Sequence, residues 1–231
     1  MKLKSFVLNL LFPIYCLGCG REGSWLCEKC FGTLKSPDKR LSYRQKHHLV
    51  IPDLTDVFIA GDYDGDPLLA LTIKQYKYDF MIDLGKILAR FLGDSWEKSA
   101  VQITLSPKPL SINPLTTDPL IMPIPLSRRR YLWRGFNQAE ILAREFSARF
   151  NYGFHLKLKR IRHCQPQAEL NGAKRLDNIR GIFSWTGADL NGQTLILIDD
   201  VVTTGSTLNE AARVLKLAGA GRIYGLVLAK G

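Results

Sequence analysis

The stretch Leu195–Thr207, LILIDDVVTTGST in one-letter code, decides the fold of the C-terminal half of the chain. Its first four residues are apolar and predict a strand, Leu195–Ile198, buried on both faces of a parallel sheet. Asp199 and Asp200 follow at the carboxyl end of this strand, the edge where open parallel sheets bind ligands. Small and hydroxyl residues then lead into a predicted helix, Ser206–Ala218, with an apolar stripe on one side.

The loop between this strand and this helix has the composition of an anion-binding site. Successive backbone N–H groups and a helix N-terminus together form a cradle for phosphate. Gly205 lets the backbone approach a ligand closely, and the neighbouring Thr and Ser hydroxyls add hydrogen bonds. Two carboxylates beside a phosphate require a ligand that also presents hydroxyl groups or a bound Mg²⁺. A ribose 5-phosphate meets this condition, with its phosphate in the loop and its diol on Asp199 and Asp200.

Strands and helices alternate on both sides of this stretch. The expected strands are Asp56–Tyr63, Leu120–Ile124, Phe154–Leu158 and Ile223–Leu228, and the expected helices are Leu68–Lys98 and Asn137–Phe150. Four prolines between Leu105 and Pro119 predict an exposed loop. The alternation predicts the α/β class with a doubly wound, mainly parallel sheet.

Positive charge is concentrated in the middle of the chain. The 231 residues carry a net charge of +11, and thirteen Lys and Arg face four Asp and Glu between Arg128 and Arg180. This asymmetry suggests a polyanionic ligand, either a phosphorylated small molecule or nucleic acid, with a solvated basic surface as the alternative. The segment Pro123–Arg130 predicts a basic turn after a strand, and Arg forks match phosphate oxygens. Arg128 and Arg129 are therefore candidate pyrophosphate ligands, with a solvated Arg cluster as the alternative.

Four of the five cysteines lie close together near the N-terminus. Cys16-x-x-Cys19 and Cys27-x-x-Cys30 form two knuckles, and each can present two thiolates to one tetrahedral Zn²⁺. An all-cysteine set leaves no open coordination position, so the predicted site is structural. Two disulfides or a redox Cys-x-x-Cys pair are the alternatives, and the fifth cysteine, Cys164, is expected to be an inert thiol.

The N-terminal apolar run, Phe6–Ile14, resembles a signal peptide only superficially. Asn9 and Pro13 interrupt it, no small-residue cleavage site follows, and it is shorter than the roughly 20 residues that span a bilayer. We expect a short amphipathic helix there, no membrane span in the chain, and a cytoplasmic protein. The expected division is an N-terminal helix and zinc-binding module at 1–55 and a ligand-binding domain at 56–231.

The segment Leu195–Thr207 resembles the phosphoribosyl-pyrophosphate (PRPP) motif of type I phosphoribosyltransferases at every position. The resemblance implies that Asp199 and Asp200 are catalytic and hold the ribose hydroxyls, and that Thr203–Thr207 hold the 5-phosphate. The implied PRPP-binding residues are Asp199, Asp200, Val201, Thr203, Thr204, Gly205, Ser206 and Thr207. Mg²⁺ would bind the pyrophosphate and the diol rather than a cage of protein ligands. The implied chemistry is displacement of pyrophosphate from C1 of the ribose by positioning and charge stabilisation.

A four-cysteine knuckle ahead of such a domain resembles the ComF family (ComFC, or GntX-like), which is associated with DNA uptake. Arg134–Ala139 matches the RGFNQA signature of the family, and Lys77-Tyr78 matches its Lys-Tyr pair. Its spaced pattern is matched by Gln167, Leu170, Arg175, Asn178 and Phe183. The resemblance adds Arg134 to the basic residues near the pyrophosphate, and it implies a mobile loop around Arg175 and Asn178. Taken alone, the RGFNQA segment also fits a plain helix N-terminus, with Asn137 as N-cap and Arg134 and Gln138 exposed.

Three functional hypotheses follow. The first is an enzyme that transfers a ribosyl phosphate from Mg-PRPP to an unknown acceptor. The second is a competence factor that binds single-stranded DNA, together with other DNA-uptake proteins, and uses the phosphate site as a sensor or clamp. Tyr131, Trp133 and Phe136 interleave with arginines in the pattern of such binding, with core or loop packing as the alternative. The third is a regulator that binds PRPP without turnover and recruits a partner through the cysteine knuckle.

Overall fold

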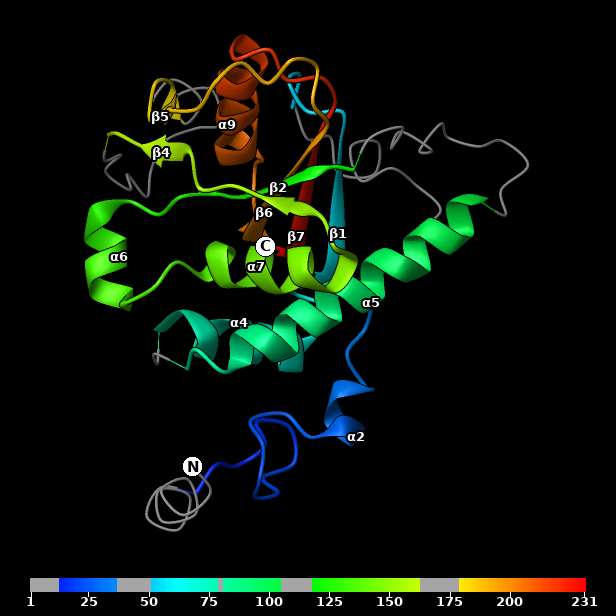
Figure 1. Ribbon diagram of the computed structural model, residues 1–231. Helices are drawn as coiled ribbons and strands as arrows, with labels where there is room; N and C mark the ends of the chain where they lie inside the picture. The colour runs from blue at the N-terminus through cyan, green and yellow to red at the C-terminus, as the bar shows by residue number, and fades with distance from the viewer. Residues whose placement is uncertain (1–12, 37–50, 79–80, 105–117, 163–178) are drawn as a thin grey trace.

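The computed structural model describes residues 13–36, 51–78, 81–104, 118–162 and 179–231 (Figure 1). The expected helix at Phe6–Ile14, the proline-rich loop at 105–117, Cys164 and the segment with Arg175 and Asn178 lie wholly or mainly outside these ranges. Among the described residues, no helix is long and apolar enough to span a membrane.

A five-stranded parallel sheet forms the centre of the molecule (Figure 1). Its order is β1–β7–β6–β2–β3, and its strands are β1 (Asp56–Asp62), β7 (Ile223–Lys230), β6 (Leu195–Val202), β2 (Leu120–Pro123) and β3 (Gly153–Phe154). In register, Leu120 lies beside Leu195 and Leu195 beside Ile223, so the carboxyl ends of β2, β6 and β7 share one edge. This confirms the predicted parallel α/β architecture.

Helices cover both faces of the sheet (Figure 1). Helices α4 (Pro67–Tyr78), α5 (Leu84–Thr104) and α7 (Gln138–Phe150) pack on one face, where they cover Ile196 and Ile198 of β6. Helix α9 (Ser206–Leu217) packs on the other face against Leu195 and Leu197. All four of these β6 side chains are fully buried, and each contributes about 1.5–3 kcal/mol to folding. The continuous apolar run in the sequence therefore has the predicted cause, burial on both faces.

Two expected elements are each divided in the structure. The single helix expected at Leu68–Lys98 is two helices, α4 and α5, because the apolar spacing continues across the turn between them and periodicity alone does not show the break. The strand expected at Phe154–Leu158 is also wrong. β3 ends at Phe154, and the chain then leaves the central sheet. The next strand, β4 (Leu158–Arg160), pairs antiparallel with β5 (Phe183–Trp185) in a separate two-stranded sheet.

The cysteine segment lies apart from the sheet, beyond α4 and α5 (Figure 1). It contains the short helix α2 (Glu28–Phe31), and its buried residues Cys16, Leu26 and Cys30 pack against Leu68 of α4 and Ile87 of α5. Ile51 and Leu54 lie nearer the expected domain boundary and pack instead in the core beneath α9. The division at residue 55 remains a proposal.

Candidate functional site

The carboxylates Asp199 and Asp200 lie inside β6, which continues to Val202 rather than ending at Ile198 as expected. Asp199 lies beside Val227 of β7, so pairing with the neighbouring strand persists beyond the apolar run. Consecutive side chains leave a strand on opposite faces. Asp200 accordingly lies on the face covered by α4 and α7, and Asp199 lies on the face of α9 and β4.

Asp200 is buried and lies between two cations. The Lys77 Nζ, from the last turn of α4, is 3.0 Å from Asp200 Oδ1. The Arg134 Nη1 is 3.9 Å from Asp200 Oδ2 and also donates to Gln138 Oε1 at 3.1 Å. Burial of an ionised carboxylate is unfavourable unless it is paired, and these two partners supply the compensation.

Donors without acceptors lie next to this pair. Arg134 and Gln138 are 8% and 1% exposed, yet within the described part of the chain Arg134 Nε and Gln138 Nε2 have no hydrogen-bond partner. A buried donor left unpaired costs about 1–3 kcal/mol. An acceptor-rich ligand such as a phosphate would relieve this cost. The alternative expectation that Arg134 and Gln138 are exposed is wrong, although Asn137 does cap α7 by accepting from Ala139 N at 3.2 Å.

Asp199 is partly buried and carries an unusual carboxyl group. Burial and the neighbouring charge of Asp200 raise its pKa to about 7, while the N–H of Asp200, Lys77 and Arg160 oppose the shift. The Asp200 N donates to Asp199 Oδ1 at 2.8 Å. The two adjacent carboxylates therefore differ chemically, since Asp200 has a direct ion pair and Asp199 takes up a proton near neutral pH.

The loop after β6 has the geometry of an anion cradle. Gly205 has a φ of 82° and precedes α9 as its N-cap residue, a conformation that an L side chain would strain. Thr203 and Thr204 are exposed, while Ser206 is buried and shares a 2.7 Å hydrogen bond with the Thr204 hydroxyl. The N–H groups of the first helical turn have no intrahelical acceptor, which makes this terminus attractive to anions.

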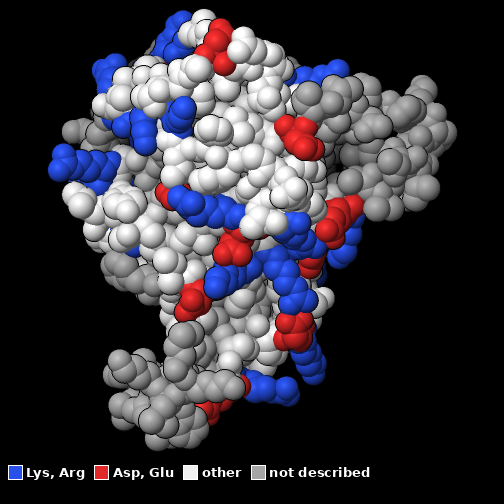
Figure 2. All heavy atoms as spheres, viewed as in Figure 1, with Lys and Arg blue, Asp and Glu red and all other residues white. Residues whose placement is uncertain are grey.

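The predicted basic turn is instead a helix, α6 (Arg128–Arg134). Ser127 caps it by accepting from Arg130 N at 3.4 Å, and Gly135 ends it in the left-handed conformation. A Ser before the arginines and a Gly after them are readable helix signals that the sequence interpretation missed. Arg128, Arg129 and Arg130 are exposed. Figure 2 shows projecting Lys and Arg side chains at the left edge, where α6 lies in Figure 1.

Aromatic side chains lie beside the buried Arg134. The guanidinium of Arg134 is 5.3 Å from the Tyr78 ring centroid, and the Tyr78 and Trp133 rings are 5.5 Å apart. Tyr78 and Trp133 are 46% and 57% exposed, so this corner faces solvent. Phe136 differs from them, because it packs on the buried Tyr76 with ring centroids 5.4 Å apart. Sequence reasoning noted Lys77-Tyr78 only as a family pair and did not place it at the carboxylates.

The four cysteines converge as predicted. The thiol sulfurs of Cys16, Cys19, Cys27 and Cys30 all lie within 4.8 Å of one another, and the Sγ atoms of Cys19 and Cys27 are 3.7 Å apart. Tetrahedral zinc with bonds of about 2.3 Å separates its sulfurs by about 3.8 Å. The donor set and its spacing therefore fit a closed, structural metal site.

The four thiols differ in their tendency to ionise when no cation is bound. Burial opposes ionisation of Cys16, but backbone N–H donors outweigh it and lower the pKa of its thiol to about 6. Burial and the neighbouring cysteines raise the pKa of Cys30 to about 12. Four thiolates this close repel one another unless a cation neutralises them.

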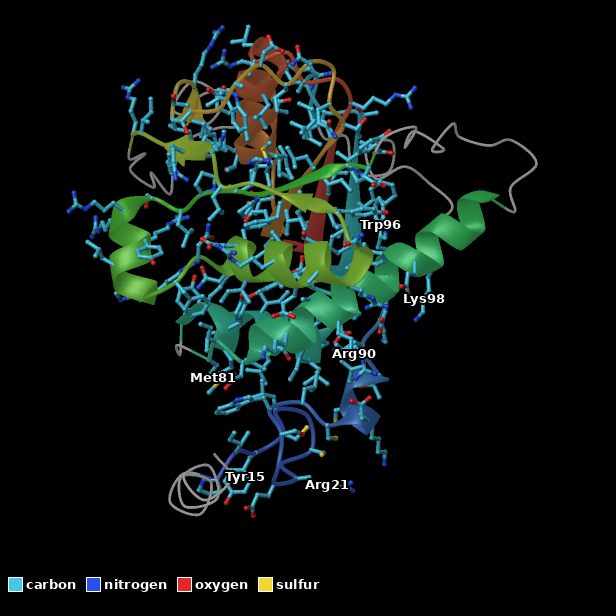
Figure 3. The ribbon with its side chains drawn as sticks, viewed as in Figure 1. Tyr15, Arg21, Met81, Arg90, Trp96 and Lys98 are labelled. Atoms are coloured by element: carbon cyan, nitrogen blue, oxygen red, sulfur yellow. The ribbon has the colours of Figure 1, made fainter. Side chains whose placement is uncertain are left out.

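Among the polar contacts that join the cysteine segment to the rest of the described structure, two involve Arg90 and Asp66. Arg90 of α5 lies between α5 and α2 (Figure 3), where it pairs with Glu28 at 2.6 Å and covers the Phe31 ring. Buried Asp66 accepts from Lys35 N at 2.8 Å with one oxygen, and its other oxygen accepts from Leu68 N and Leu69 N at the start of α4. The end of the cysteine segment is thus attached to the helix that carries Lys77.

Comparison with known proteins gives a family. A model described as the phosphoribosyl transferase domain matches residues 133–231. Competence protein F of Haemophilus influenzae is 28% identical over 213 residues, which cover 90% of this chain and 80% of that protein. The chain belongs to the ComF family.

Other relatives align over a smaller share of their length. DNA utilization protein YhgH of Salmonella typhi is 29% identical over 69% of this chain and 66% of its own. Competence protein ComFC of Streptococcus pneumoniae is 32% identical over 63% of this chain and 56% of its own. A solved glutamine PRPP amidotransferase from B. subtilis, complexed with ADP and GMP, aligns with 14% identity and a TM-score of 0.35 over 66% of this chain and 26% of that chain. This ComF-family chain thus spans about half to four fifths of the curated relatives named here.

Proposed function

We propose that this protein binds Mg-PRPP at the carboxyl edge of β6 and displaces its pyrophosphate in favour of an acceptor. A phosphoribosyltransferase domain implies a PRPP-like ligand. The observation that carries the proposal is the juxtaposition of the Gly205 cradle with a carboxylate pair that has its own cations, Lys77 and Arg134. The proposed diol site, Asp199 and Asp200, and the proposed phosphate site, Thr203–Thr207, thus lie close together in the chain.

Each group in the site has a distinct role in this proposal. Asp199 and Asp200 accept hydrogen bonds from the ribose hydroxyls, and the loop Thr203–Thr207 donates to the 5-phosphate. Arg134, whose buried Nε has no hydrogen-bond partner among the described residues, faces the pyrophosphate. Mg²⁺, when bound with PRPP, neutralises the charge that develops on the departing pyrophosphate. The protein contributes positioning and electrostatic stabilisation, which suffice for a reaction of this kind.

Titration calorimetry with Mg-PRPP tests the proposal directly. The zinc-loaded wild type should bind saturably, and Asp199→Ala/Asp200→Ala should lose binding. Asp118→Ala is the matched control, because Asp118 is exposed at the amino end of β2, on the opposite edge of the sheet. A folded wild type that does not bind Mg-PRPP would contradict the proposal. Release of pyrophosphate in the presence of candidate acceptors then separates an enzyme from a regulator that binds without turnover.

The names of the relatives, competence protein and DNA utilization protein, support a role of the proposed activity in the use of DNA. One surface favours a second function, single-strand binding. Helix α6 has no acidic residue, and it exposes Tyr131 at 48% and Trp133 at 57% among its arginines. Positive charge with stacking rings is the usual pattern for unspecific strand binding. Phe136 is excluded from this surface by its packing on Tyr76.

Fluorescence anisotropy with a labelled oligonucleotide tests this second function. Affinity should fall steeply as salt rises. In Arg128→Ala/Arg129→Ala, the slope of log affinity against log salt concentration should correspond to about two fewer phosphate contacts. Trp133→Ala should weaken binding by about 1–3 kcal/mol at constant salt. Affinity that does not depend on salt would exclude this surface as a strand-binding site.

A further inference from the structure

Lys77 is held in an unusual position for a lysine at the end of a helix. Its side chain is only 16% exposed, although Lys74, one turn earlier on α4, is exposed. Lysine ammonium groups are strongly hydrated and are rarely buried without a partner. The only partner that the described residues give Lys77 is Asp200, at 3.0 Å.

Attachment of α4 to the sheet does not explain this ion pair. Leu69, Ile73 and Tyr76 are fully buried on the same helix, and the Tyr76 hydroxyl donates to the Gln138 carbonyl oxygen at 2.9 Å. These contacts already fix the position of the helix. A partly buried ion pair adds little stability on balance, because desolvation offsets the attraction.

Two cations that pair with Asp200 instead offset the charge of the carboxylate pair. Asp199 and Asp200 carry two negative charges when both are ionised, and Lys77 and Arg134 carry two positive charges. Arg160 of β4 also acts on Asp199, from the other face of the sheet, and the phenol of Tyr76 lies close enough to Asp200 to be affected by its charge. Loss of one cation would leave a polyanion at this edge with less positive charge to offset the two carboxylates.

We propose that Lys77 is a positioning residue of the ligand site, which holds Asp200 in place and neutralises the carboxylate pair so that a polyanion can bind there. This inference rests on the proposed function, since the polyanion is Mg-PRPP. Lys77 lies far from the phosphate loop in sequence. It reaches the site only because α4 ends beside the carboxyl end of β6.

The proposal makes a prediction about charge that a purely structural role would not. Lys77→Met should weaken Mg-PRPP binding at pH 8 by about tenfold, because the ligand then meets an uncompensated carboxylate. At pH 6 the Asp199 carboxyl, whose pKa is raised to about 7, takes up a proton in the wild type and in the variant alike. The loss relative to wild type should therefore persist at pH 6, because the same cation is missing there. Lys77→Arg should bind within about threefold of wild type at both pH values.

Calorimetric titration of zinc-loaded protein with Mg-PRPP at pH 6 and pH 8 measures this effect. Lys74→Met is the matched control, since it removes the same charge from an exposed position on the same helix. Lys77→Gln, which keeps a donor for Asp200 without the charge, replaces Lys77→Met if the latter does not fold. Equal affinities of the Lys77 and Lys74 variants, or a loss in Lys77→Arg as large as in Lys77→Met, would overturn the inference while leaving PRPP binding by the wild type intact. Absence of binding by the wild type would instead overturn the proposed function itself.

Discussion

The cysteine module and the carboxylate site are assembled in opposite ways. The module takes all its candidate ligands from one short stretch, Cys16–Cys30, and its spacing is legible in the sequence. The carboxylate site takes Lys77 from α4, Arg134 from α6 and Asp200 from β6. A local site depends on its ligands and its metal, whereas a dispersed site depends on the packing of every element that contributes to it. The two regions should therefore respond differently to single changes.

Removal of one cysteine should have the largest effect. Cys16→Ser leaves three thiols for a metal whose binding contributes about 10–16 kcal/mol in comparable structural zinc sites. We expect loss of the one bound zinc and unfolding of residues 13–36, with the parallel sheet retained. Metal analysis and hydrogen exchange measure both effects. Cys164→Ser is the control and should keep its zinc; collapse of the sheet together with the module would show that the two regions are not separable.

Protonation of Asp199 should have the next largest effect. Its pKa is about 7 in the folded protein and about 3.9 in an unfolded chain, so the folded state binds the extra proton between these values. Stability should thus fall as pH rises from 4 to 8, by up to about 4 kcal/mol. Asp199→Asn should remove this dependence and be relatively most stabilising at pH 8. Denaturant unfolding at pH 5 and pH 8 measures it, and parallel pH profiles for the variant and the wild type would contradict it.

Gly205→Ala should lower both stability and ligand affinity, by less than the protonation of Asp199 changes stability. An L side chain at a φ of 82° costs roughly 1–2 kcal/mol, because its Cβ approaches the following carbonyl oxygen. The chain can relieve this strain only by changing the cradle, so affinity for Mg-PRPP should fall by at least about tenfold. Gly192→Ala is a suitable control, with a φ of 77° in open space. Equal losses of affinity in the two variants would show that the cradle conformation is not required.

The surface ion pair between the two regions should have the smallest effect. Glu28 pairs with Arg90 on the surface, and exposed ion pairs add little because solvent screens them. Glu28→Gln should therefore leave both zinc content and Mg-PRPP affinity within about twofold of wild type. A larger change in PRPP affinity, measured by the same calorimetry, would reveal coupling between the cysteine module and the carboxylate site.

The sequence predicted well those elements whose signals are local. The strand–loop–helix unit at Leu195–Thr207, the capped helix α7 and the converging cysteines are all present in the structure. It failed where two alternatives share one pattern. The break between α4 and α5 leaves the apolar periodicity unchanged, and the arginines that predicted a turn form the helix α6.

By itself, then, the sequence determined the parallel α/β class, the four-thiol cluster and the strand–loop–helix unit at Leu195–Thr207, because each depends on residues close together in the chain. Only the tertiary structure decided which charges accompany the carboxylates. Lys77 and Arg134 reach Asp200 because α4 and α6 both end at the carboxyl edge of the sheet. It also decided that Asp199 and Asp200 leave β6 on opposite faces and meet different partners. The physical reason is that burial and charge pairing are properties of the packed elements, and neither is encoded in the spacing of any single motif.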